Sequence, residues 1–315
     1  MLLSERLRAT EFIIFLTIAA QCVVFALLSP SFLTLNNLIN VTLQIAIYGI
    51  LAVGMTVVMV SGGIDLSVGS IVALAGVMAA ISSKAAAMPA AAVVAGVAAG
   101  VGVGILTGAV SGIFIARFGI PPFIVTLAMM TICRGFVFTI TGGFTEGELP
   151  ASFGWLGRGH LGHIPVPVIV MALLFAAGFV MLEQTAFGRH IYALGGNEEA
   201  SRLSGVRVRR AKVLVYSLNG LLAGLAGVIL AARLGAGAPN SGLQYELDVI
   251  AAVVVGGTSL SGGRGSILGT LAGTIFIGVL NNGLNLANVD PYTQKIALGI
   301  VILGAVWIDM VQKRQ

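Results

Sequence analysis

The sequence predicts an all-α protein, a polytopic bundle of about ten membrane-spanning helices that contains an internal repeat and broken helices. Hydrophobic residues make up 57% of the 315 residues and charged residues only 9%, whereas soluble domains are about 25% charged. The mean hydropathy is +1.03. Glycine is abundant, with 43 residues, and small residues let membrane helices approach closely, because lipid supplies no hydrophobic force between helices.

Apolar segments define the expected helices, since a spanning helix needs about 20 apolar residues. Ten segments are candidates: 12–28, 41–61, 67–83, 90–116, 122–141, 165–183, 212–232, 247–258, 265–286 and 293–309. The eighth is short, and the third and eighth border glycine-rich breaks. We expect the first to be a retained helix, because further membrane segments follow it. Residues 1–315 are therefore expected to form a single transmembrane domain.

The distribution of lysine and arginine predicts the orientation, because basic residues accumulate in cytoplasmic loops. If the N-terminus is inside, twelve of the seventeen lysines and arginines lie on the inner side. The outer side holds only Lys84, Arg158, Arg233 and Lys295, and Arg134 lies within a span. Both termini are therefore expected in the cytoplasm. The net charge of +5 is explained by this inner face, without a nucleic-acid partner.

Two glycine-rich segments resemble each other. Residues 62–76 read GGIDLSVGSIVALAG, and residues 256–273 read GGTSLSGGRGSILGTLAG. Both contain a glycine pair, then Leu-Ser, then Gly-Ser-Ile at the start of an apolar segment. Repeated broken helices in the two halves of a membrane chain indicate a transporter built from a duplicated unit. A glycine-rich composition can also produce such a match by chance.

The first of these segments is a candidate helix break or gate, formed by Gly62, Gly63, Asp65 and Ser67. The two glycines allow the second span to stop, and the oxygen atoms of Asp65 or Ser67 can cap the next helix. Such caps matter in a bilayer, where free N–H groups find no water. The sequence leaves open whether 62–66 is a turn between spans or a break within the membrane. It also leaves open whether the segment moves during transport.

The cytoplasmic loop 184–212 contains a short helix. Asn197 is a favourable N-cap, Glu198 and Glu199 fall in the first turn, where the helix dipole favours acids, and Gly205 suits the C-terminal cap. A helix of under ten residues is too short to be stable alone. It must therefore pack on its own protein or on a cytoplasmic partner.

The same loop carries a family resemblance. The stretch FGRHIYALGGNEEASRLSGVRVRRAKVLVYSLNGLLAGLAGVILAARL resembles the permease subunits of bacterial sugar ABC importers of the ribose type. The similarity continues through YELDVIAAVVVGGTSLSGGRGSILGTLAG and NNGLNL, and upstream through GMTVVMVSGGIDLSVGSIVALAG. It covers residues 12–309 and is weakest in the outer loop 142–164. The family's coupling helix carries over onto Asn197, Glu198, Glu199, Ala200, Ser201, Arg202, Leu203, Ser204 and Gly205.

The resemblance implies a permease in the bacterial inner membrane that carries ribose or a related monosaccharide. Its implied partners are a second permease copy, a tandem-domain ATPase that holds ATP and Mg, and a periplasmic sugar-binding protein. The sequence also indicates that another chain supplies the energy for transport, because no phosphate-binding loop occurs and the dipeptide Gly-Lys is absent. We expect no catalytic residue, metal site or cofactor in this chain.

The alternative is a stand-alone secondary transporter or channel. Such a protein would need ion-coupling acids inside its spans. Asp65 is expected at a break, and the remaining acids near the apolar segments, which are Glu183, Glu246, Asp248 and Asp309, are expected near span ends. The sequence therefore favours the importer.

Amide side chains mark a candidate sugar path, because amides both donate to and accept from hydroxyls. Two groups are expected toward the outer side: Asn37, Asn40 and Gln44, and Asn281, Asn282 and Asn285. Interhelical hydrogen bonding is the alternative role for these amides. Arg134, deep in the fifth span, is either a substrate contact or a structural partner.

Overall fold

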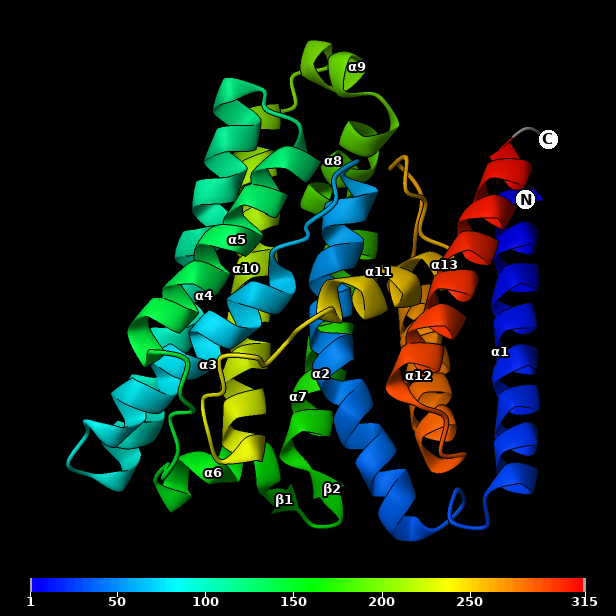
Figure 1. Cartoon of the computed structure of the whole chain (residues 1–315). Coiled ribbons are helices and arrows are strands. Elements are labelled where there is room, and N and C mark those ends of the chain that lie inside the picture. The colour runs from blue at the N-terminus through cyan, green and yellow to red at the C-terminus, as the bar shows by residue number, and fades with distance from the viewer. Residues whose placement is uncertain (1, 314–315) are drawn as a thin grey trace.

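The computed structural model describes residues 2–313, and these are almost entirely helical (Figure 1). Residues 1, 314 and 315 of the expected domain lie outside the described residues. The helices are α1 (Leu2–Leu28), α2 (Leu35–Val60), α3 (Val68–Lys84), α4 (Pro89–Phe118), α5 (Pro122–Thr141), α6 (Ala151–Arg158), α7 (Val166–Phe179), α8 (Ala186–Gly196), α9 (Glu198–Leu203), α10 (Val208–Leu234), α11 (Tyr245–Val255), α12 (Ile267–Leu286) and α13 (Pro291–Lys313). A π-helical turn, Val180–Gln184, follows α7, and strands β1 (His160–Leu161) and β2 (Ile164–Pro165) form a hairpin.

The expected all-α bundle is confirmed, and each of the ten expected spans overlaps one helix. Six helical segments of the described chain are long and apolar enough to cross a membrane: α2, α4, α5, α7 with its π-helical turn, α10 and α12. Shorter apolar helices occupy α3 and parts of α1 and α13. Large apolar side chains such as Leu27 (83% exposed) and Leu303 (73% exposed) cover the periphery, as expected for surfaces that meet lipid.

The centre of the bundle is formed by α2 and α10, which pack with α3 and α4. Glycines allow α4 and α10 to approach backbone to backbone. A Cβ atom on Gly104 would meet the Gly220 carbonyl oxygen, and one on Gly220 would meet the Gly104 carbonyl oxygen. Buried glycines recur every four residues along α4, from Gly96 to Gly112, and close helix packing explains this spacing.

The two similar segments share one structural motif. After α2, the Gly62 N–H donates to the Met59 carbonyl and the Gly63 N–H to the Val58 carbonyl; after α11, Gly257 and Thr258 make the equivalent bonds. Gly62 and Gly257 both have positive φ, at 84° and 88°, so both helices end in a glycine cap of the Schellman type. The structural register differs by one residue from the sequence match, because Gly62 corresponds to Gly257 and not to Gly256.

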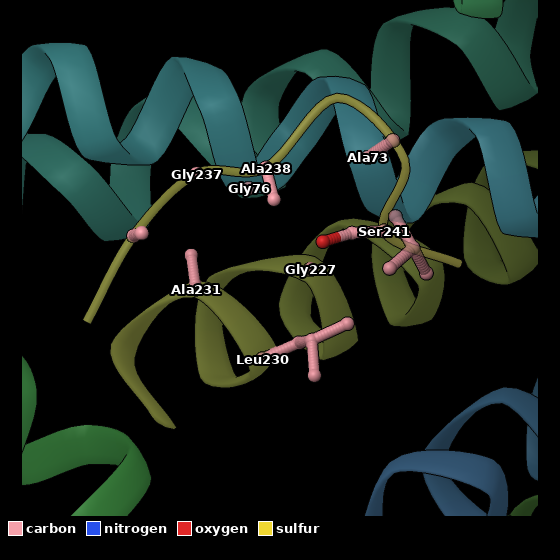
Figure 2. Close-up of a pocket in the computed structure, with 10 residues that line it drawn as sticks. Ala73, Gly76, Gly227, Leu230, Ala231, Gly237, Ala238 and Ser241 are labelled. Atoms are coloured by element: carbon pink, nitrogen blue, oxygen red, sulfur yellow. The ribbon is translucent and has the colours of Figure 1, made fainter. Parts of the chain in front are cut away.

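The chain re-enters the bundle before α11. Residues 235–244 turn back from the end of α10 and run alongside α3 and α10, so that α11 begins at middle height (Figure 1). Figure 2 shows this loop over Gly76 of α3 and Gly227 of α10, and the crevice between them does not admit a water molecule. The eighth span is thus a half-length helix of 11 residues. Glu246 and Asp248 lie in its first turn, near a span end as expected, but this end lies at middle height in the bundle (Figure 1).

The loops gather at opposite ends of the bundle. The start of α1, the end of α13, helices α8 and α9 and the loop 257–266 lie at one end, and α6 and the β-hairpin lie at the other (Figure 1). The segments expected on the inner side thus share one end. Helix α6 was not expected, and its buried Phe153 packs against Gly96 of α4.

Candidate functional site

Helix α9 is the expected loop helix, and its capping follows from its sequence. The Asn197 side chain accepts a hydrogen bond of 2.9 Å from the Ala200 N–H. At the other end, Gly205 has a φ of +88° and the Val206 N–H donates to the Ser201 carbonyl. Local hydrogen bonds therefore cap the six-residue helix at both ends. A helix of this length is still too short to be stable alone.

Helix α9 projects from the bundle. Of Asn197–Gly205 only Ser201 is buried, and the Leu203 side chain is 79% exposed. Lys212 holds the helix to α10 through an ion pair of 2.7 Å with Glu198. An exposed leucine at the tip of a capped, projecting helix is suited to contact with another protein.

A glycine junction connects the base of α9 to both helix breaks. We define it as Gly62 after α2, Gly195 at the end of α8, and Gly262 and Gly263 in the loop 257–266. The Gly263 N–H donates to the Val60 carbonyl at 2.8 Å. A Cβ on Gly195 would meet that same carbonyl oxygen, and one on Gly262 would lie 2.7 Å from the Gly62 Cα. Three segments distant in sequence thus touch through their backbones.

Tyr192 of α8 makes a second link to the loop 257–266. Its hydroxyl lies 2.9 Å from the Gly265 carbonyl oxygen and 3.1 Å from a Glu183 carboxylate oxygen. Burial, and then the neighbouring Glu183 charge, raise the pKa of Tyr192. The hydroxyl therefore remains a neutral donor at physiological pH.

The candidate break 62–67 is held inside the protein by Asp65, which is fully buried. One carboxylate oxygen accepts from the Ser67 N–H at 2.8 Å and from the Ser67 hydroxyl at 2.5 Å. The other accepts from the Asn219 amide of α10 at 2.8 Å. The segment has no regular secondary structure and runs from the end of α2 back along the bundle to α3 (Figure 1). Ser67 makes no side-chain cap bond to α3, and Asp65 fixes the turn before the helix instead.

Arg134 is bound by backbone carbonyl groups of its own protein. Its guanidinium donates to the Pro239 carbonyl at 2.6 Å and to the Ser241 carbonyl at 3.1 Å, and it reaches the Gly69 carbonyl at 3.5 Å. It also interacts electrostatically with Glu246. Arg134 therefore fastens the re-entrant loop to the start of α3.

The candidate path amides separate into two kinds. Asn37 and Asn282 are buried and pair reciprocally, with N–O distances of 3.0 and 2.9 Å, so they join α2 to α12. Asn285 accepts from Gln294 at the end of α12, and Asn40 is exposed. These four amides are not brought together with the other two.

Gln44 and Asn281 belong to another group, the α11 polar cluster, which we define as Gln44, Tyr48, Tyr245, Asp248 and Asn281. The Asn281 amide donates to an Asp248 carboxylate oxygen at 3.1 Å. The rings of Tyr48 and Tyr245 meet edge to face with centroids 4.9 Å apart, and the Gln44 side chain contacts the Tyr48 hydroxyl. Sequence reasoning missed the two tyrosines and Asp248, because only the re-entrant loop brings α11 to this depth.

A multi-pass bundle with broken helices and a projecting loop helix defines the chain as a membrane permease, a class supported by comparison with known proteins. The family of branched-chain amino acid transport system permease components matches residues 37–306, and the chain belongs to this family.

Curated relatives confirm the expected resemblance to sugar permeases. The chain is 49% identical to the ribose import permease RbsC of Escherichia coli K12 over 90% of this chain and 88% of that protein. Identity to RbsC of Bacillus subtilis is 48%, over 94% of this chain and 91% of the relative. The xylose transport permease XylH of Escherichia coli K12 is 36% identical, over 90% of this chain and 87% of that protein. No solved structure matches the chain.

Among the described residues, no group of three or more histidines, cysteines or acids is placed to hold a metal ion.

Proposed function

We propose that this chain is the permease subunit of an ATP-driven ribose importer in the bacterial inner membrane, with both termini in the cytoplasm. Its partners are a second permease copy, a tandem-domain ATPase that binds ATP and Mg, and a periplasmic sugar-binding protein. The higher identity to ribose permeases, 43–49%, than to the xylose permease, 36%, supports ribose as the sugar.

The observation that carries the coupling role is the projecting helix α9. Its surface is exposed, and its base meets the glycine junction within a few residues. A displacement of α9 by the ATPase would reach both the end of α2 and the loop before α12. These are the two places where the helices are broken. The proposed cycle moves these segments so that the bundle opens first outward and then inward.

The test is transport by the purified chain in lipid vesicles. Alone, even with a proton or sodium gradient, it should accumulate no ribose. Addition of the ATPase, the binding protein and ATP should start uptake, and excess unlabelled xylose should compete less well than ribose. Uptake driven by an ion gradient in the chain alone would support the rival stand-alone transporter and contradict the importer.

A further inference from the structure

The α11 polar cluster lies where polar side chains are costly. Tyr245 and Asp248 occupy the first turn of a helix that begins inside the bundle, and Gln44, Asp248 and Asn281 are only half-buried. Polar and ionisable residues at membrane depth seldom face lipid and commonly line a polar cavity or pathway. Their partial exposure therefore indicates a side of the bundle that meets water, substrate or a second copy.

The cluster has unused hydrogen-bonding capacity. One Asp248 oxygen accepts from Asn281, and the other has no hydrogen-bond partner among the described residues. A carboxylate accepts at both oxygens, and an amide both donates and accepts. By contrast, the buried amides of Asn37 and Asn282 bond each other, so that few of their donors and acceptors remain for a ligand.

The chemistry of the cluster matches a small sugar. Neighbouring hydroxyls can donate to Asp248 and exchange bonds with the amides of Gln44 and Asn281. The apolar C–H face of the sugar ring can pack on the half-buried ring of Tyr245, which the buried ring of Tyr48 supports edge to face. Helix α2 and the distant pair α11 and α12 contribute these groups, so the site exists only in the folded bundle.

We infer that the α11 polar cluster is a transient contact site for a monosaccharide during its passage through the permease. This inference rests on the proposed function and deepens it, because it assigns the residues that the sugar meets inside the membrane. The ligand class is an uncharged sugar with adjacent hydroxyls, and Asp248 is the principal acceptor.

The first test is ribose uptake by the full importer reconstituted in vesicles. Asp248→Asn should lower the uptake rate about tenfold, which corresponds to the loss of one hydrogen bond to a charged group. Tyr245→Ala, which removes the ring, should lower it severalfold. Both variants should keep subunit assembly and ATPase stimulation by the binding protein. The matched control Tyr292→Ala, at a tyrosine that is 78% exposed at the start of α13, should transport normally.

The second test measures ligand protection directly. Tyr245→Cys is placed in a background with Cys22→Ala and Cys133→Ala, and its modification by N-ethylmaleimide is timed with and without saturating ribose during turnover. Ribose should slow the reaction. Normal uptake by both Asp248→Asn and Tyr245→Ala, or equal modification rates, would overturn the inference. Failure of the proposed function appears differently, as a wild-type importer that carries no ribose.

Discussion

At the scale of single residues, the structure separates amides that hold helices together from amides that remain available. Asn37 and Asn282 look alike in sequence to Asn281, since each lies near one end of a long apolar helix, α2 or α12. Their partners distinguish them, because Asn37 and Asn282 bond each other, whereas Asn281 bonds Asp248. An amide–amide pair inside a membrane bundle stabilises the contact of α2 with α12.

Replacement of Asn282 by alanine should therefore affect stability more than transport. The Asn37 side-chain oxygen would lose its partner while it stays buried, which costs about 1–3 kcal/mol. We expect a lower unfolding midpoint in a detergent denaturation titration, with near-normal ribose uptake by the protein that remains folded. Asn40→Ala, at an exposed amide of α2, the helix that carries Asn37, is the control. Unchanged stability with abolished uptake would instead place Asn282 on the sugar path.

At the scale of elements, α9 is the segment whose form matters most for the proposed coupling. The ion pair between Glu199 and Arg202 is at the surface, where both side chains are about two-thirds exposed, so it contributes little. The N-cap bond of Asn197 and the closing turn at Gly205 hold the shape. A single charge change should be mild, whereas a break in the helix backbone should not.

Leu203→Pro should break α9 without affecting the bundle. The proline ring would clash with the preceding turn and cost about 3 kcal/mol or more, which a six-residue helix cannot absorb. We expect normal insertion, but loss of the bound ATPase or ATP hydrolysis without ribose uptake, measured on the reconstituted importer. Leu203→Ala keeps the helix and removes only the exposed side chain, so it should be the milder change. Normal transport by Leu203→Pro would move the coupling contact elsewhere, with the loop 257–266 as the next candidate.

The comparison of α9 with α11 explains what the sequence could predict. The cap, first turn and closing glycine of α9 are all local, and its bounds followed from them. The depth of α11 depends on Arg134, whose bonds to the re-entrant loop span 105 and 107 residues. No local pattern encodes such contacts. For the same reason the middle height of the α11 acids was not expected. Of the α11 polar cluster, the sequence indicated Gln44 and Asn281 as path candidates but not the two tyrosines or Asp248.

At the scale of the whole molecule, the arrangement of loops at two ends makes the proposed orientation testable. In the Cys22→Ala and Cys133→Ala background, Glu199→Cys introduces a thiol on α9, and His163→Cys one on the β-hairpin at the other end. An impermeant thiol reagent should label the hairpin in intact spheroplasts, and α9 only after the membrane is opened. Both positions are exposed, so accessibility reports the side of the membrane. The reverse pattern would overturn the orientation and the role of α9 as the ATPase contact.

The glycine junction also bears on how stiff the proposed linkage is. Where two segments meet through side chains, a change of rotamer can absorb part of a small displacement, so that only the remainder reaches the second segment. At Gly195, Gly262 and Gly263 the backbones themselves touch, and no rotamer exists to yield. In the proposed cycle, a movement that arrives from α9 would therefore reach the end of α2 and the loop 257–266 together and with little loss. The glycine junction would in this way synchronise the two helix breaks.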